Sequence, residues 1–183
     1  MISTENGWEE QAKGRRNRYR SYLKDAILLG LYTGSRLDSI VHLKWKDIEA
    51  NYVKPPNVKR NTREKTDEHH ELIYITSDFA SFLAQLPRGD EDEYILAPEL
   101  ERSTVHESIT KGFTHFWRLV SSEKKSFTHL RKTHSTRMGI LLGDKIKLLK
   151  RHASNDTTRR HYMNQAELSK MMEGVVMFDL GIT

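Results

Sequence analysis

Residues 19–48 read YRSYLKDAILLGLYTGSRLDSIVHLKWKDI, and this stretch decides the fold. Apolar residues recur at helical spacing over residues 19–33, and Gly34 follows at a position where helices commonly end. A second helix is predicted over about residues 37–44. Arg36 lies between the two predicted helices. Its guanidinium can therefore be held at the rim of a helical core.

The rest of the chain predicts a mainly helical domain with a small antiparallel β-sheet, an α+β fold. Short strands are predicted at residues 51–53 and 72–75, and the charged stretch 54–71 between them predicts a long solvated hairpin or loop. Ser77 and Ser103 are predicted to cap two further helices. The last third is predicted to be helical over residues 128–142, 145–151 and 155–163. The expected core includes Trp45, Ile48, Phe113, Phe116 and Trp117.

The composition bounds the class of protein. The chain has 183 residues, a formal net charge of +5 and a hydrophobic fraction of 37%, which suit one domain with a real core and are compatible with a nucleic-acid partner. It has no cysteine, which excludes disulfides, thiolate zinc sites and cysteine nucleophiles. No apolar run approaches the roughly 20 residues that a membrane span needs. We therefore expect a cytoplasmic protein without membrane association.

Four separated segments carry side chains suited to phosphate chemistry. The first joins the two N-terminal helices, the second precedes the second strand, and the third and fourth lie in the helical last third. In order, they are Thr33-Gly34-Ser35-Arg36 with Leu43-Lys44-Trp45-Lys46-Asp47-Ile48, then Lys65-Thr66, then Thr128-His129-Leu130-Arg131-Lys132-Thr133, and finally His152-Ala153-Ser154 with Thr157-Thr158 and Tyr162.

This order of motifs resembles the tyrosine recombinase family, also called the phage integrase family. The family's Thr-Gly-x-Arg motif followed by Leu-x-Trp-x-Asp-Ile matches residues 33–48, and its Leu-Arg-x-Thr box matches residues 130–133. Its His-x-Ser, Thr-Thr and Tyr box matches residues 152–162. Each motif alone is weakly specific, but four in the family's order indicate its catalytic domain. The resemblance implies cutting and rejoining of DNA through a 3′-phosphotyrosine, without metal, ATP or another cofactor.

The resemblance assigns a role to each matched residue. Arg36 and Arg131 would clamp the nonbridging oxygens of the phosphate through forked hydrogen bonds and stabilise charge in the transition state. His152 would add a hydrogen bond to the same phosphate. Tyr162 would be the nucleophile, its phenolate favoured by the cationic pocket. Lys65 would be the general acid that protonates the leaving 5′-oxygen.

One position departs clearly from the family pattern. The family has a histidine three residues before the second arginine, and here that residue is Thr128. Threonine can contact a phosphate, but it cannot transfer protons near neutral pH. His129 and His134 lie nearby, but the register does not favour them. A smaller departure is Ser39, preceded by Asp38, where the family tends to place an acid.

The lysine has alternatives in the same charged stretch. Lys54 and Lys59 also lie there, and Lys65 is preferred because it precedes the second strand by about the family's spacing. The neighbouring pair His69-His70 is expected to belong to a solvated turn. Adjacent residues of a strand point to opposite faces, so these two histidines are not expected to chelate a metal together.

We expect three parts along the chain: residues 1–18 as a linker or N-terminal remnant, residues 19–163 as the catalytic domain, and residues 164–183 as a tail. The tail is apolar at residues 175–180 and needs a surface to pack on, either this domain or a neighbouring protomer. Relatives carry a DNA-binding domain before the catalytic one, so we expect this chain to be a fragment of a longer protein and to bind DNA weakly by itself. The resemblance implies double-stranded DNA as partner, a homo-tetramer on DNA and a monomer in isolation, in a prokaryote, phage or mobile element.

Two other function classes remain open. One is a non-catalytic DNA-binding module on the same fold, impaired at Thr128. The other is an unrelated helical regulator, in which the matched residues would scatter over the surface. Type IB topoisomerases use related chemistry, but the motif spacing here is more similar to an integrase.

Overall fold

The structure is a computed structural model that describes residues 17–142, 172 and 174–180. Within these residues the chain is mainly helical with one small antiparallel sheet, so the predicted α+β class is confirmed. In chain order, the elements are α1 (Leu23–Thr33), α2 (Leu37–Val41), the 3-10 helix η1 (Trp45–Asp47), β1 (Tyr52–Val53), α3 (Val58–Glu64), β2 (Ile73–Tyr74), α4 (Ser77–Gln85), α5 (Arg102–Val120) and α6 (His129–Leu142).

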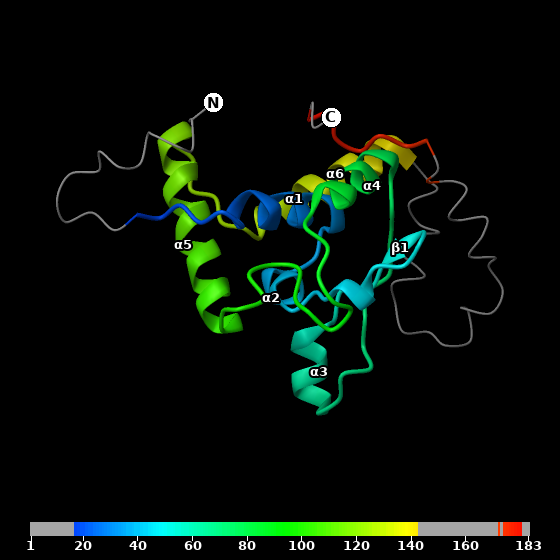
Figure 1. The fold of residues 1–183 in the computed structure, drawn as a ribbon. Helices are drawn as coiled ribbons and strands as arrows, with labels where there is room; N and C mark the ends of the chain where they lie inside the picture. Colours follow the sequence, from blue (N-terminus) through cyan, green and yellow to red (C-terminus); the bar gives the residue numbers. More distant parts are fainter. Residues whose placement is uncertain (1–16, 143–171, 173, 181–183) are drawn as a thin grey trace.

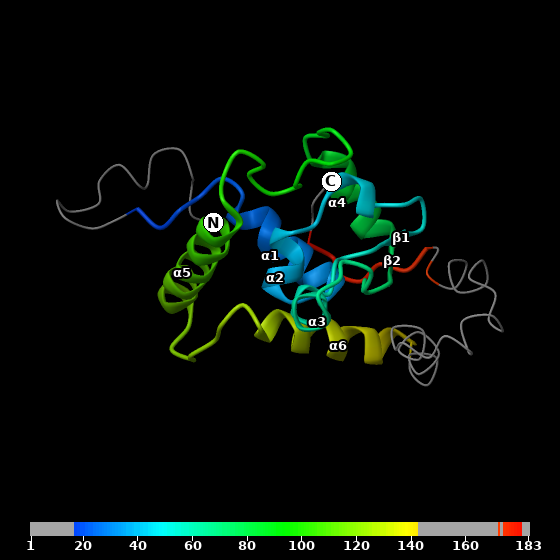
Figure 2. The same cartoon turned by 90° about the horizontal axis from the view of Figure 1, so that it is seen from below.

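Helix α1 is the centre of the fold. It lies between α6 on one side and α4 on the other, with α5 near its N-terminal end (Figures 1 and 2). Its buried residues include Leu29 and Tyr32, which are 0% and 2% exposed. The predicted end of this helix is confirmed, because Gly34 adopts a left-handed conformation and its N–H donates to the carbonyl of Gly30. The start lies at Leu23 rather than near residue 19.

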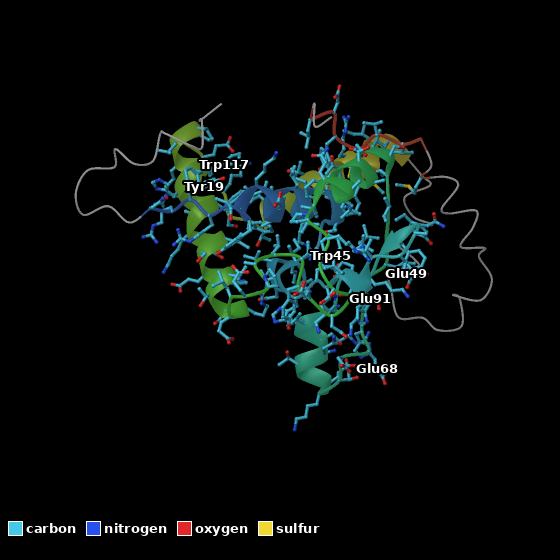
Figure 3. The ribbon with its side chains drawn as sticks, viewed as in Figure 1. Tyr19, Trp45, Glu49, Glu68, Glu91 and Trp117 are labelled. Atoms are coloured by element: carbon cyan, nitrogen blue, oxygen red, sulfur yellow. The ribbon has the colours of Figure 1, made fainter. Side chains whose placement is uncertain are left out.

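The second predicted helix ends earlier than expected, at Val41 rather than near residue 44. The reason is a pairing between distant segments. Ile95 donates its N–H to the carbonyl of Leu43, and Trp45 donates to the carbonyl of Glu93. These bonds hold the chain extended after α2. Trp45, predicted as a core anchor, is 3% exposed and lies near the middle of the molecule (Figure 3).

The two predicted strands form the sheet. They pair antiparallel, with Tyr52 opposite Tyr74 and Val53 opposite Ile73. The stretch between them differs from the predicted hairpin or loop, because it contains α3. Figure 1 shows α3 projecting away from the layer of α1, α4 and α6, and Glu68 lies beside it in Figure 3.

Local hydrogen bonds explain why α3 forms in a charged segment. The side chain of Asn57 accepts a hydrogen bond from the N–H of Arg60 and caps the helix. Asn61, which is buried, binds both the carbonyl and the N–H of His69 through its side-chain amide. Glu64 accepts hydrogen bonds from Arg63, Arg60 and His69, which lower its pKa to about 2. The helix is therefore fastened to the segment that returns to β2.

The serines predicted to cap α4 and α5 lie inside these helices and not directly before them. The residue before α4 is Thr76, whose hydroxyl donates to the carboxylate of Asp78, and Ser77 is the first helical residue. Helix α5 begins at Arg102, so the predicted cap Ser103 lies inside it. The guanidinium of Arg102 donates to the carbonyls of Val41 and Leu96 and stacks on Tyr94 at 4.2 Å. This side chain, rather than a serine hydroxyl, fixes the start of α5.

The described part of the tail packs on its own chain. Met172 and Met177 are each 1% exposed, and Met177 belongs to the hydrophobic core. Phe178 meets Tyr32 edge-on at 5.7 Å, and its N–H donates to the carboxylate of Asp78 at 2.7 Å. Of the two surfaces expected for the tail, the structure therefore places these residues on this domain. Exchange of the segment between protomers stays a prediction of the resemblance.

Tyr32 makes the stability of this core dependent on pH. Burial, the negative charge of Asp78 and a hydrogen bond to its carboxylate raise the pKa of Tyr32 to about 12. The unfolded chain releases this proton near pH 10. The stabilisation is therefore complete below pH 10 and is lost as the pH rises from 10 to 12. By linkage, the wild-type free energy of unfolding should fall by about 2–3 kcal/mol over this range on account of Tyr32.

The matched variant for this prediction is Tyr32→Phe, which cannot ionise. Urea unfolding of both proteins between pH 9 and 12 measures the difference. The two stability curves should converge as the pH rises, because only the wild type loses the contribution of Tyr32. Curves that stay parallel over this range would show that folding does not raise the pKa of Tyr32.

Candidate active site at the junction of α1, α2 and α6

The turn that carries Arg36 is built by its neighbours in sequence. The hydroxyl of Thr33 donates to the carbonyl of Leu29 at 2.6 Å and accepts the N–H of Ser35 at 3.1 Å. Gly34 supplies the left-handed conformation, with φ of 61°. Arg36 follows in an extended conformation as the residue before α2. Its position at the helix junction is therefore set by the Thr-Gly-Ser sequence before it.

A carboxylate from the β region fastens the same turn. Ser35 is 1% exposed, and its hydroxyl donates to Glu71 at 3.0 Å. The N–H of Glu71 in turn donates to the carbonyl of Pro55. This contact spans 36 residues and ties the segment before β2 to the arginine-bearing turn. Sequence reasoning missed Glu71, because nothing in its local pattern distinguishes it from the other acidic residues of that stretch.

Helix α6 packs closely against the end of α1. A Cβ atom at Gly30 would lie 2.8 Å from the ring of Phe127 and 3.0 Å from the side chain of Leu130. The absence of a side chain at Gly30 therefore lets the start of α6 approach α1. Leu130 is 9% exposed and precedes Arg131, so this packing fixes the place where Arg131 leaves the helix.

Arg131 carries an unusual feature for an arginine. Its side chain is half-buried, and its Nη1 atom is buried without a hydrogen-bond partner in the part of the chain that the structure describes. An unpaired buried donor costs about 1–3 kcal/mol, and more when the group is charged. A bound anion would supply the missing acceptor. Arg36, by contrast, has an exposed side chain.

The first and third of the four segments are joined where α6 contacts the turn after α1. His134, one helical turn beyond Arg131, lies against Gly34, where a Cβ atom would be 2.5 Å from the imidazole ring. Its Nδ1 atom lies 2.9 Å from the carbonyl oxygen of Leu31. The structure therefore brings the segment of Arg36 and the segment of Arg131 together. His134 was set aside on register, and only its contacts across 103 residues distinguish it.

Thr128 lies just before α6, where its side chain is exposed. The neighbouring His129 folds back on the helix start, with Nδ1 accepting the N–H of Ser126 at 3.1 Å. Ser39, which stands where the family tends to have an acid, is 3% exposed. Asp38 is exposed and lies 3.4 Å from His106 on α5. Neither residue has a described hydrogen bond to Arg36.

Lys65 lies at the end of a helix and not in the predicted hairpin or loop. It is the residue that ends α3, with φ of 52°, and it is exposed. It lines a groove of about 650 Å³ whose lining includes neither Arg36 nor Arg131. The lining includes three lysines and two histidines, with two aspartates among them: Lys44, Lys46, Lys65, His42, His70, Asp47 and Asp67. In this structure Lys65 thus belongs to a basic groove beside the arginine-bearing turn.

The alternative lysines are placed differently. The ammonium of Lys54 is paired with Glu49 and lies over the ring of Tyr52. The hydrogen bond to Glu49 raises the pKa of Lys54, which makes it a poorer proton donor. Lys59 is exposed on α3. Lys54 is therefore disfavoured, while the preference for Lys65 over Lys59 stays a prediction from the motif spacing.

The remaining predicted site residues, His152 and Tyr162, lie outside the described residues. The pair His69-His70 is separated in its bonding, because His69 contacts Glu64 at 2.5 Å while the backbone of His70 bridges to Pro56. Among the residues that the structure covers, no group of three or more potential metal ligands occurs. None of the helices described is long and apolar enough to cross a membrane.

Comparison with known proteins adds no relative to this picture. No protein-family model matches the chain, and no curated protein or solved structure matches it either. The motifs and the geometry of the described residues therefore stand alone as support for a function.

Proposed function

We propose that this chain is the catalytic domain of a tyrosine recombinase, which cuts and rejoins double-stranded DNA through a covalent 3′-phosphotyrosine. The observation that supports it best is Arg131. Its buried Nη1 has no hydrogen-bond partner among the described residues, and His134, one turn further along α6, contacts the turn that precedes Arg36. The segments that carry Arg36 and Arg131, about 95 residues apart in sequence, are thereby joined, which is compatible with a metal-free phosphate site formed by both arginines.

The proposed reaction uses each residue once. The phenolate oxygen of Tyr162 attacks phosphorus, and the bond from phosphorus to the 5′-oxygen breaks. Arg36 and Arg131 bind the nonbridging oxygens and His152 adds a hydrogen bond, so the charge of the transition state is neutralised without a metal. The leaving 5′-oxygen takes a proton, for which Lys65 is the proposed donor. A 5′-hydroxyl of another strand reverses the step and completes the exchange.

The basic groove of Lys65 fits the same proposal. It borders the segment that Glu71 fastens to the turn of Arg36, so a DNA strand bound at the arginines can continue along it. Lysines there would displace counterions from the phosphates, and affinity for DNA should then fall steeply with salt. Lys65 lines this groove, so DNA bound along it would bring a phosphate close to the ammonium of Lys65.

The test is formation of a covalent adduct. The chain is incubated with a library of nicked duplexes of random sequence, in the presence of EDTA and without ATP, and protein-linked DNA is separated in denaturing detergent. We expect adducts with the wild type and none with Tyr162→Phe, which lacks the nucleophilic oxygen but preserves the ring. EDTA should not change the yield.

Two other outcomes separate the alternatives. Salt-dependent DNA binding with no adduct above the Tyr162→Phe level would favour a non-catalytic DNA-binding module. Absence of both DNA binding and adducts would favour a helical regulator with accidental motif matches.

A further inference from the structure

The contact between His134 and the end of α1 is not part of the proposed chemistry. Leu31 lies in the last turn of α1, where backbone carbonyls have no partner within the helix. Its carbonyl oxygen lies 2.9 Å from Nδ1 of His134. Because a carbonyl oxygen only accepts hydrogen bonds, Nδ1 must carry the hydrogen and donate it. The imidazole therefore caps α1 from the neighbouring helix α6, in one fixed orientation.

Gly34 completes this contact. A Cβ atom there would lie 2.5 Å from Cδ2 and 2.8 Å from Cγ of His134, and 3.2 Å from its Cβ. Real Cβ atoms do not approach so closely, so the ring occupies the space that the missing side chain leaves. Two features therefore require glycine at this position: the positive φ of its backbone, and the space that the imidazole ring of His134 occupies.

The position of the imidazole links the two arginines. Arg36 lies two residues beyond Gly34, and Arg131 lies three residues before His134, on the same face of α6. A shift of the ring against Gly34 would move the two guanidiniums relative to each other. A displacement of about 1 Å in such a site can cost about 10²-fold in rate.

We infer that His134 is a positioning residue, which sets Arg36 against Arg131 by joining the end of α1 to α6. This inference rests on the proposed function and deepens it, because it explains how two arginines from distant segments hold one phosphate. In this proposal His134 orients the two arginines and transfers no proton. Thr128 and His129 take no part in this contact.

Three substitutions separate orientation from simple packing. The amide nitrogen of Asn lies as many bonds from Cα as Nδ1 of histidine does, so His134→Asn can keep the hydrogen bond to Leu31. His134→Gln places its amide where Nε2 lies and loses that bond, and His134→Ala loses both ring and bond. We measure thermal unfolding, DNA affinity and the single-turnover rate of adduct formation for the full chain.

We expect His134→Ala and His134→Gln to form adducts about 10²-fold more slowly, with DNA affinity within about threefold of the wild type because the backbone contacts remain. His134→Asn should recover to within several-fold of the wild-type rate. If His134→Ala proves unfolded, the comparison of Asn with Gln still decides. Equal rates for Asn and Gln, or a wild-type rate for Ala, would overturn the positioning role.

The wild type distinguishes this failure from failure of the proposed function. A wild-type chain that forms no adduct overturns the proposed function and the positioning role with it. A wild type that forms adducts, beside a His134→Gln variant that does so equally fast, overturns the positioning role alone.

Discussion

Arg131→Ala should reduce the rate of adduct formation on cleavable DNA by about 10²–10³-fold, with DNA affinity reduced by less than about tenfold. The guanidinium acts most strongly when negative charge grows on the phosphate oxygens, and the loss of one such donor costs about 10²–10³ in rate. The Nη1 of Arg131 has no hydrogen-bond partner among the described residues, so the substitution breaks no hydrogen bond of that atom there, and we expect the free energy of unfolding to change little. Single-turnover kinetics and urea unfolding measure the two effects.

Two matched variants make the result specific. Arg131→Lys keeps the charge but not the forked geometry, and it should remain at least about 10²-fold slower than the wild type. Arg118→Ala removes the same charge from an exposed position on α5, so its adduct rate should stay within about threefold. If Arg118→Ala slows the reaction as much as Arg131→Ala does, the effect is one of net charge, and the phosphate clamp is wrong.

Met177→Asp should destabilise the isolated chain by about 3 kcal/mol or more, because it buries an unpaired charge. Met177 is 1% exposed within the core. Its backbone carbonyl accepts a hydrogen bond from Nε of Arg137 at 2.6 Å, which joins the tail to α6. Urea unfolding of the monomer gives the free energy directly.

The control for the tail lies next to Met177. Val176 is 49% exposed, so Val176→Asp introduces the same charge at a solvated position and should change stability by no more than about 0.5 kcal/mol. Equal and small effects of both variants on the monomer would mean that the tail contributes little to its own domain. Such a result would favour docking on a neighbouring protomer, the other surface expected for the tail.

The sequence allowed the helical centre of the fold to be predicted because its signals are local. The apolar spacing of residues 19–33 and the glycine after them mark a helix and its end, and both strands were recognised at residues 51–53 and 72–75. The α3 helix was not recognised. It depends on two hydrogen bonds between the side-chain amide of Asn61 and the backbone of His69, and no pattern of hydropathy predicts such bonds.

The site was predictable only as far as its motifs. The residue types around Arg36 and Arg131 follow from local spacing, but the meeting of the two segments depends on contacts between residues far apart in the chain. The bond from Ser35 to Glu71 and the fit of His134 against Gly34 are such contacts. The register of the family motif directed attention to Thr128, while the packing of α6 on α1 makes His134 the histidine that meets the arginine-bearing turn.

The most direct measurement is the identity of the residue that becomes linked to DNA. Adducts formed in EDTA are digested with nuclease and trypsin, and the modified peptide is sequenced by tandem mass spectrometry. The proposed function predicts a nucleotide on Tyr162, within the tryptic peptide of residues 161–170. A nucleotide on any of the six other tyrosines of the chain's seven, or no modified peptide from a chain that binds DNA, would contradict it.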